Sequence, residues 1–414
     1  MKRKMLSLSL FAALAATALA QQGAVPTGIP SLNHVFVIMM ENHGYGEIIR
    51  NPNAPFTNQY AKTANLATNY FAVAHPSLTN YLEVVGGSNF GVLSDNPPNW
   101  HNQGCAVNLV SKVPNTDNPP SVNICPIKGS GTDAATPLLD CSNEVSGPPC
   151  EIEIDNVHQI AANPNTVGMT IADQLVAAGK TWKTYQESLP LRSPDLVNYS
   201  DGNFTNLTNF AFINPQLNPP LSSSNIVQLY AAKHNPFLYF LNVELGTNPQ
   251  ISYAQMTAFD GATGLWADLA SGNAPTYSFI VPNQCNDQHG RGNGTAFCGY
   301  DPTSNGTQAG LNPALIQLGD QTVQKIVTAI HQSPVWSQGN NAIVVVWDEN
   351  DYSVQPIINQ VVAIVDTNYG SRGLTSNVFY NHFSLLGSIE GGLGLPCLNN
   401  ACNAAVMTDL FSAP

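Results

Sequence analysis

The chain has few charged residues for its length. Lysine, arginine, aspartate and glutamate make up 10% of its 414 residues, against about 25% in an average globular domain. Only 14 residues are basic and 27 are acidic, which gives a formal net charge of −13. Because a negatively charged surface repels nucleic acids and anionic membranes non-specifically, we expect no nucleic acid as a partner.

Long hydrophobic runs are also missing, apart from one near the N-terminus. There, basic residues 2–4 precede apolar residues 5–14, and small residues at 18–20 match a signal-peptidase site. The apolar run is too short to span a bilayer, and the C-terminus shows no hydrophobic tail that would signal a lipid anchor. We therefore expect residues 1–20 to be a signal peptide and the mature protein to be secreted and extracellular, without stable membrane insertion.

No Cys-x-x-Cys pair is present, which argues against a zinc ribbon. The eight cysteines are even in number, so in a secreted chain we expect four disulfides. Close spacing favours the pairs Cys285–Cys298 and Cys397–Cys402. The other four cysteines lie in a stretch rich in Pro, Asn and Gly.

That stretch, about residues 91–165, is predicted to be a disulfide-rich insertion in a single domain that covers residues 21–414. Sequons for N-glycosylation are present outside the insertion, which fits a secreted glycoprotein. They begin at Asn198, Asn203, Asn206, Asn293 and Asn305.

Two apolar runs, residues 34–40 and 342–347, each end in oxygen-bearing side chains. Glu41 and Asn42 follow the first run, and Asp348 and Glu349 follow the second. Short β-branched runs are typical of buried parallel strands, and ligands of open α/β sheets bind at the carboxyl ends of such strands. These four side chains are therefore predicted to meet at one rim and to bind a hard divalent cation.

Strands that alternate with helices predict an α/β protein, specifically a three-layer αβα sandwich with a mostly parallel central sheet. Helices are expected near 44–70, from Ser77 through Val85, over 170–185, after an N-cap at Asp320, and over 377–389. Further strands are expected at 237–243, 277–281 and 360–365.

Seven short motifs occur in a fixed order along the chain. They are Met40-Glu-Asn-His43, His75-Pro-Ser-Leu-Thr-Asn-Tyr81, Trp182-Lys-Thr-Tyr-Gln-Glu187, Lys233-His-Asn-Pro236, Pro282-Asn-Gln-Cys-Asn-Asp-Gln-His289, Trp347-Asp-Glu349 and Tyr380-Asn-His-Phe-Ser-Leu-Leu386. Together they resemble the phosphoesterase family of secreted acid phosphatases and bacterial phospholipases C, within the alkaline-phosphatase-like superfamily. The resemblance extends over about residues 33–395.

The resemblance implies a nucleophile at the N-terminus of a helix, where Ser77 falls. A hydroxyl near a divalent cation loses its proton more readily, and the helix N-terminus offers N–H groups to phosphate oxygens. Asn80, one turn further on, is implied to donate to the phosphoryl group. Related phosphodiesterases usually have Pro before that Asn, and Thr79 here creates a second candidate hydroxyl. The resemblance assigns the metal to Glu41, Asn42, Asp348 and Glu349.

Three histidines, His234, His289 and His382, have two possible roles. In the first they are protonated, bind phosphate and protonate the leaving group. In the second, Asp287, His289 and His382 form another metal site, as in the wider superfamily. Nearby members of the family favour one metal together with histidines.

The sequence thus predicts a secreted, metal-dependent hydrolase of phosphoric esters that acts on a small phosphorylated substrate. Acid phosphatase activity is favoured, with Ca, Mg, Mn or Zn as the metal. A phospholipase C-like phosphodiesterase and a non-catalytic secreted glycoprotein are the alternatives. Nothing in the sequence indicates an oligomeric state.

Overall fold

The computed structural model of the chain describes residues 22–90, 95, 101–102, 127–128, 169–189, 229–240, 242–243, 246–290, 313–350 and 359–411. Several expectations lie outside the described residues: the signal peptide, most of the 91–165 insertion with its four cysteines, Cys298 and the five sequons. Within the described ranges, none of the helices combines the length and the apolar character needed to cross a bilayer.

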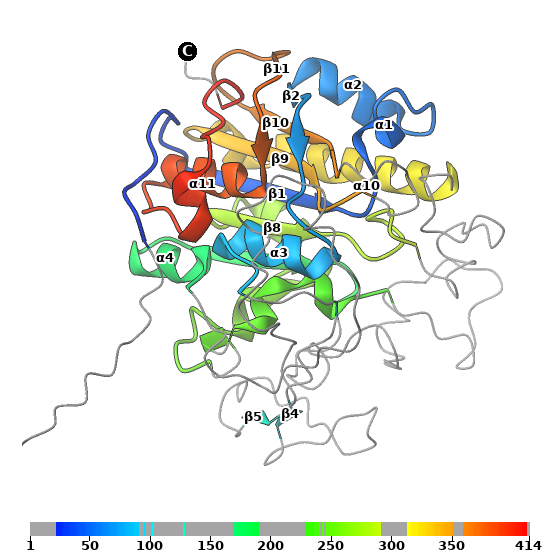
Figure 1. Cartoon of the computed structure of the whole chain (residues 1–414). Helices are drawn as coiled ribbons and strands as arrows, with labels where there is room; N and C mark the ends of the chain where they lie inside the picture. Colours follow the sequence, from blue (N-terminus) through cyan, green and yellow to red (C-terminus); the bar gives the residue numbers. More distant parts are fainter. Residues whose placement is uncertain are drawn as a thin grey trace, which may run out of the picture.

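An eight-stranded sheet forms the centre of the described part of the chain, in the order β11-β2-β10-β9-β1-β8-β6-β7 (Figure 1). The strands are β1 (His34–Met40), β2 (Asn65–Ala67), β6 (Trp182–Gln186), β7 (Met256–Thr257), β8 (Tyr277–Val281), β9 (Asn341–Trp347), β10 (Ala363–Thr367) and β11 (Thr375–Ser376). Strands β9, β1, β8, β6 and β7 run parallel, whereas β10 is antiparallel to both of its neighbours. The prediction of a mostly parallel sheet is therefore confirmed.

Two small ladders lie outside this sheet. Strand β3 (Tyr70–Phe71) pairs in parallel with β12 (Tyr380–Asn381), and β4 (His101–Asn102) pairs antiparallel with β5 (Ile127–Lys128).

Helices pack in two groups, as expected for the outer layers of an αβα sandwich. Helix α3 contacts α4 and α11, while α10 contacts α2 and α8; Figure 1 shows α3 and α11 on the viewer's side of the sheet. The α-helices are α1 (Tyr45–Ile48), α2 (Pro55–Thr63), α3 (Ser77–Gly86), α4 (Ile171–Ala177), α8 (Leu265–Ser271), α10 (Pro313–Gln332) and α11 (His382–Leu393). The 3-10 helices are η3 (Ala232–His234), η4 (Pro236–Tyr239), η5 (Tyr253–Gln255), η6 (Pro334–Ser337) and η7 (Asn399–Asn403).

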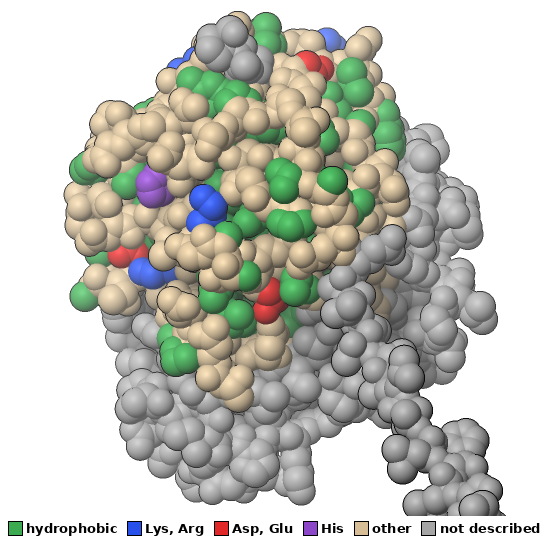
Figure 2. Space-filling view, turned by 90° about the vertical axis from the view of Figure 1, so that its left-hand side faces the viewer, with side chains coloured by type: hydrophobic (Ala, Val, Ile, Leu, Met, Phe, Trp, Pro, Cys, Tyr) green, Lys and Arg blue, Asp and Glu red, His purple; other side chains and the backbone are tan. Residues whose placement is uncertain are grey.

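The central strands are buried because their neighbours and the helices cover both of their faces. Every residue of β9 and all but the first residue of β1 are buried. This burial is the reason why both strands read as continuous apolar runs rather than as alternating patterns. Outside this core, the surface carries few charges. Figure 2 shows one face on which a few basic, acidic and histidine side chains lie among many hydrophobic and uncharged groups.

The helix expected over residues 170–185 is wrong in its second half. Helix α4 ends at Ala177, and residues 182–186 form strand β6 instead. Gly179 has φ +70°, a left-handed conformation that helices commonly use to terminate. The chain therefore turns after α4, and the Trp-Lys-Thr-Tyr-Gln segment enters the sheet next to β8.

The strand expected at 237–243 is also wrong, because residues 236–239 form the 3-10 helix η4. Pro236 has no N–H to donate to a sheet ladder and favours the first turn of a helix. The helix expected over 377–389 begins later, at His382. Asn381 ends strand β12, and its Oδ1 accepts from the N–H groups of Phe383 and Ser384, both at 3.1 Å.

Asp320 caps a helix, but not the one that was expected. It lies inside α10, where its two carboxylate oxygens accept from the N–H groups of Phe56 (3.0 Å) and Thr57 (2.7 Å). These N–H groups belong to the first turn of α2, whose own N-cap residue, Ala54, makes no side-chain hydrogen bond. Asp320 thus satisfies the orphan donors of α2 from a neighbouring helix.

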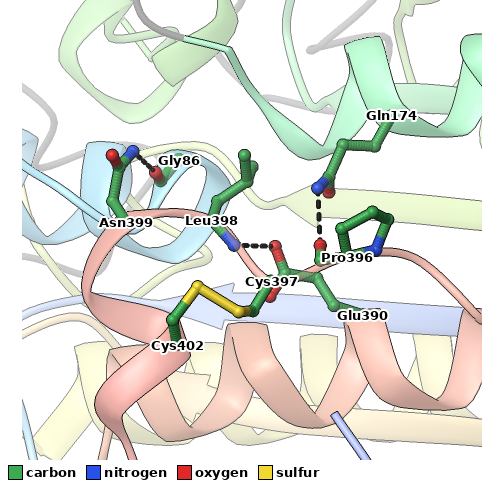
Figure 3. Close-up of a disulfide and its surroundings, with 8 residues drawn as sticks. All are labelled: Gly86, Gln174, Glu390, Pro396, Cys397, Leu398, Asn399 and Cys402. Atoms are coloured by element: carbon green, nitrogen blue, oxygen red, sulfur yellow. Dashed lines mark hydrogen bonds between the residues drawn. A yellow bond between two sulfur atoms is a disulfide. The ribbon is translucent and has the colours of Figure 1, made fainter. Parts of the chain in front are cut away.

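The disulfide expected between Cys397 and Cys402 is present, with the two Cα atoms 5.0 Å apart (Figure 3). Cys285 is also disulfide-bonded, to a partner outside the described residues. A disulfide in the folded chain is typical of proteins from oxidising compartments.

The loop closed by this disulfide connects α11 to α3. Leu398 N–H donates to the Glu390 carboxyl group at 3.0 Å, and Asn399 Nδ2 donates to the carbonyl of Gly86 at 2.7 Å (Figure 3). Burial raises the pKa of the Glu390 carboxyl group well above its usual range, while the hydrogen bond from Leu398 opposes this shift. The loop therefore fixes the C-terminal end of α3, the helix that begins at Ser77.

Replacing Asp320 should destabilise the fold through the loss of its cap on α2. We expect Asp320→Ala to lower the free energy of unfolding by about 1–2 kcal/mol, measured by urea denaturation. Asp320→Asn keeps one acceptor oxygen and serves as the matched control, with a smaller loss expected. Equal stability of Asp320→Ala and the parent chain would contradict the capping role.

Candidate active site

The pairing of β1 with β9 brings two polar segments together at one rim of the sheet. The last paired residues are Met40 and Trp347, so the residues that follow them leave the sheet side by side. Asn42 N–H donates to Asp348 Oδ1 at 3.0 Å. The structure thus joins the two predicted metal-binding segments, which are 306 residues apart in the sequence.

Ser77 is the first residue of α3, and its hydroxyl lies between two carboxylates. Its Oγ is 3.1 Å from Glu41 Oε2 and 3.1 Å from Glu349 Oε1. The hydroxyl of Thr79 instead donates to the carbonyl of Pro76 at 2.6 Å, within its own helix turn. Of the two candidate nucleophiles, only Ser77 faces the carboxylates.

Asn80 holds the turn that precedes Ser77. Its Oδ1 accepts from the N–H groups of Val73 (3.1 Å) and Ala74 (3.0 Å). Its Nδ2 donates to the carbonyl of Ala74 at 2.7 Å and to Glu349 Oε2 at 3.2 Å. Both amide hydrogens therefore bind protein groups, and in this structure Asn80 positions the nucleophile segment. Donation from Asn80 to a phosphoryl group stays a prediction.

His234 connects two carboxylates across the site. Its Nε2 is 3.1 Å from Glu41 Oε1, and its Nδ1 is 3.3 Å from Asp287 Oδ2. The Tyr81 ring stacks on the imidazole, with centroids 5.3 Å apart and planes 5° from parallel. When His234 is an imidazolium and the carboxylates are ionised, both contacts are ion pairs.

The neighbours of His289 determine which of its ring nitrogens carries the proton when the ring is neutral. Its Nδ1 is 2.9 Å from the carbonyl of Gly290 and must donate to it. When the ring is neutral, Nε2 then carries the lone pair, which faces Lys233 Nζ at 3.2 Å. The backbone N–H of His289 also donates to Asp287 Oδ1 at 2.7 Å, so this turn fixes both residues.

The loop that carries Asp287 is held by Glu187, the last residue of the Trp182–Glu187 motif. Glu187 Oε2 accepts from Asn283 N–H at 3.0 Å, and both of its carboxylate oxygens lie 2.8 Å from Asn286 Nδ2. Glu187 thus orients the loop and does not itself enter the cluster around Ser77.

Both ring nitrogens of His382 make hydrogen bonds with neighbouring protein groups. Its Nε2 donates to the carbonyl of Asp348 at 2.6 Å, and its Nδ1 is 2.9 Å from the hydroxyl of Tyr70. Burial lowers the pKa of His382 to about 4, so the ring is neutral near neutral pH. These contacts direct His382 to the end of β9 rather than to a shared metal position with Asp287 and His289.

His75 was not assigned a role from the sequence, yet it contacts the site directly. Its Nδ1 is 2.9 Å from Glu349 Oε2, and its Nε2 is 3.0 Å from Asn350 Oδ1. Burial, the largest single influence, acts to lower the pKa of His75, but Glu349, Asp348 and Asn350 together outweigh it, so the pKa lies above its usual value. An imidazolium here neutralises part of the carboxylate charge.

The carboxylates of the site are buried together, which is electrostatically unfavourable. Burial, followed by the charges of Asp348 and Asp287, raises the pKa of Glu41 well above its usual range. Burial also raises the pKa of Asp287 well above its usual range, and burial with the Glu349 charge raises that of Asp348 to about 8. Lys233 opposes the shift at Glu41 and at Asp287.

These groups fit a divalent cation. Asn42 Oδ1 and Asp348 Oδ2 are buried and have no hydrogen-bond partner among the described residues. Asn42 has φ +58°, a left-handed conformation that Asn adopts more readily than most residues. Amide and carboxylate oxygens are the ligands preferred by hard divalent cations, and an ion would offset the carboxylate charge.

A second group of possible ligands lies next to these oxygens. One atom each of Glu41, His234 and His289 lies within 4.8 Å of the others. This mixed nitrogen and oxygen set suits zinc or another transition metal. The site therefore contains all four residues of the predicted metal set, together with Asp287, Ser77, Asn80, His234 and His289.

Lys233 and Asp95 were also missed by sequence reasoning. Lys233 Nζ donates to Asp95 Oδ2 at 2.8 Å, and Asp95 Oδ1 accepts from Leu78 N–H at 3.1 Å. Lys233 belongs to the Lys233–Pro236 motif, and a lysine inside a motif of a chain with so few cations is a usable sequence signal. Asp95 has no comparable signal, because it lies in a Pro- and Asn-rich segment outside the motifs.

The sequence of the chain is similar to those of known phosphatases. The chain is 24% identical to a phosphatidylinositol-3-phosphatase of Mycobacterium tuberculosis over 98% of this chain and 94% of that protein. It is 22% identical to an acid phosphatase of Aspergillus fumigatus over 91% of this chain, which spans 58% of the fungal protein.

The fold is also similar to a solved structure described as a protein in the alkaline phosphatase superfamily from Vibrio parahaemolyticus. The match includes 94% of this chain and 74% of the Vibrio chain, with 11% identity and a TM-score of 0.45. The model of the phosphoesterase family matches residues 48–298, which is more than half of the chain. The chain therefore belongs to the phosphoesterase family and is a hydrolase that acts on phosphoric esters.

Proposed function

We propose that the protein is a secreted, metal-dependent phosphatase that cleaves phosphoric monoesters with Ser77 as its nucleophile. The observation that carries the proposal is the position of the Ser77 hydroxyl. It lies at the N-terminus of α3, 3.1 Å from the carboxylates of Glu41 and Glu349. An adjacent base and a helix N-terminus are what a hydroxyl needs to attack an anionic phosphorus centre.

The proposed reaction has two displacements. In the first, Ser77 Oγ forms a bond to phosphorus and gives its proton to Glu41 or Glu349, while the ester P–O bond breaks. The leaving alcohol takes a proton from His234, which the carboxylates of Glu41 and Asp287 hold in place. In the second, water forms a bond to phosphorus and gives a proton to His234, the bond to Ser77 breaks, Ser77 Oγ takes back the proton held by Glu41 or Glu349, and inorganic phosphate leaves.

The proposed cation would be held by Asn42 and Asp348, with Glu41 and Glu349 adjacent. When bound, a divalent ion supplies positive charge that favours ionised Ser77 and offsets charge on the phosphoryl group. His382 and His75 support residues of the site. His382 Nε2 donates to the carbonyl of Asp348 at 2.6 Å, and His75 Nδ1 lies 2.9 Å from Glu349 Oε2.

The relatives of the chain support a phosphoric monoester as its substrate, and its N-terminal sequence and a disulfide support its secretion. The relatives named above are a phosphatidylinositol-3-phosphatase and an acid phosphatase, and both names denote removal of a phosphate group. The N-terminal sequence has the pattern of a signal peptide, and the Cys397–Cys402 disulfide fits an oxidising compartment.

Ser77→Ala should abolish hydrolysis while the protein still folds. We expect kcat for p-nitrophenyl phosphate to fall by about 1,000-fold or more, because only binding and electrostatic effects remain. Thr79→Ala is the matched control and should keep most of the activity, since the Thr79 hydroxyl faces the carbonyl of Pro76.

The same assay with bis(p-nitrophenyl) phosphate separates a monoesterase from a phosphodiesterase. Faster hydrolysis of the diester than of the monoester would reject the monoester proposal. An inactive Thr79→Ala beside an active Ser77→Ala would reject the assignment of the nucleophile.

Removal of the metal should lower both activity and stability, and the loss of stability should depend on pH. Asp348 has a pKa of about 8 in the folded chain without metal, against about 3.9 in an unfolded chain. The metal-free folded state therefore binds the extra proton, and its stability falls as pH rises from about 4 to about 8. A bound cation favours the ionised carboxylate and removes this fall.

We thus expect chelator to lower the melting temperature more at pH 8 than at pH 5, and re-added metal to restore both stability and activity. Asp348→Asn, which cannot ionise, should show a smaller difference between the two pH values. Full activity in a preparation shown to be metal-free by elemental analysis would exclude the metal-dependent mechanism.

A further inference from the structure

A carboxylate occupies the place next to Ser77 where an anionic oxygen would bind. Leu78, the residue after Ser77, donates its N–H to Asp95 Oδ1 at 3.1 Å, and Asp95 Oδ2 accepts from Lys233 Nζ at 2.8 Å. The N-cap residue of α3, Pro76, offers no side-chain acceptor, so this N–H is otherwise an orphan donor. Two donors that suit phosphate oxygens therefore converge on one carboxylate.

Lys233 is fixed independently of Asp95. Its side chain is 9% exposed, whereas that of Asp95 is 31% exposed. On its other side, Lys233 Nζ faces His289 Nε2 at 3.2 Å, and His289 is itself held by the carbonyl of Gly290. The ammonium group therefore stays in place when one anion replaces another, while Asp95 is the more accessible partner.

We propose that Lys233 Nζ and Leu78 N–H form the subsite for a non-bridging oxygen of a phosphoric monoester or of inorganic phosphate, and that Asp95 is an internal competitor for these two donors. This assignment rests on the proposed phosphatase function. It identifies the positive charge of Lys233 as the feature that favours a monoester over a diester. A monoester dianion carries more charge to Lys233 than a diester does. Asp95 weakens the binding of substrate and product alike, which limits retention of the product phosphate.

The test measures phosphate binding on the full metal-loaded protein, by calorimetric titration with inorganic phosphate. Asp95→Asn keeps an oxygen that accepts from Leu78 N–H but removes the competing charge. We expect it to tighten phosphate binding about threefold or more, because like charges at one position repel. Lys233→Met should weaken binding about tenfold or more, through loss of a charge-assisted hydrogen bond.

Two controls sharpen the test. Asp260→Asn removes the same charge from an exposed position after η5 and should leave phosphate affinity unchanged. In the Lys233→Met background, Asp95→Asn should lose most of its gain if both residues act at one subsite. Lys233→Gln replaces Lys233→Met if melting curves show that the methionine variant does not fold.

Steady-state kinetics supply a second readout. Asp95→Asn should lower the KM for p-nitrophenyl phosphate and the inhibition constant of phosphate together. An Asp95→Asn variant that binds phosphate equally or more weakly overturns the proposal, because Asp95 would then only position Lys233. Unchanged affinity in Lys233→Met also overturns it. Since titration needs no turnover, the subsite can be confirmed in a protein that proves unable to hydrolyse monoesters.

Discussion

The parallel register between β1 and β9 determines where the carboxylates of Glu41, Asp348 and Glu349 lie. The two strands pair residue for residue from His34 and Asn341 to Met40 and Trp347. A slip of one residue would turn their side chains to the opposite faces of the sheet. With this register, Glu41 and Glu349 leave the sheet into one buried space that also receives Asp287 and Asp348. Gathering carboxylates away from water is costly, and the raised pKa values of Glu41, Asp287 and Asp348 express this cost.

The histidines of the site have two different roles, as sources of positive charge or as structural supports, and the groups around each histidine determine its role. His234 and His75 face carboxylates and can carry positive charge into the cluster. His382 faces a carbonyl and the hydroxyl of Tyr70, and burial keeps it neutral, so it supports the backbone at Asp348. A single residue type therefore supplies both cations and rigid supports. The cations alone do not balance the carboxylates, which is why a divalent ion is the physical complement that we propose for this site.

The sequence was sufficient to predict the fold class, because it depends on strong local patterns, and to select residues that lie together in the structure, whereas their catalytic and metal-binding roles stay predictions. The apolar runs that became β1 and β9 lie within one residue of their predicted bounds, and Glu41 and Glu349, which follow them, both contact Ser77. The errors arose where one local signal competed with tertiary context. Residues 182–186 continued a helical pattern yet joined the sheet, and Asp320 caps a helix distant in the sequence. Asp95 could not be found at all, since its importance comes only from its contacts with Leu78 and Lys233.

The central claim is that Ser77 forms a covalent bond to phosphorus and that water then releases the phosphate. The stereochemical course of hydrolysis tests this claim most directly, with a phosphoric monoester made chiral at phosphorus by oxygen isotopes and cleaved in isotopically labelled water. Each in-line displacement inverts the configuration, so two successive displacements through Ser77 predict overall retention. Inversion would show that water attacks the substrate directly, and would contradict the account.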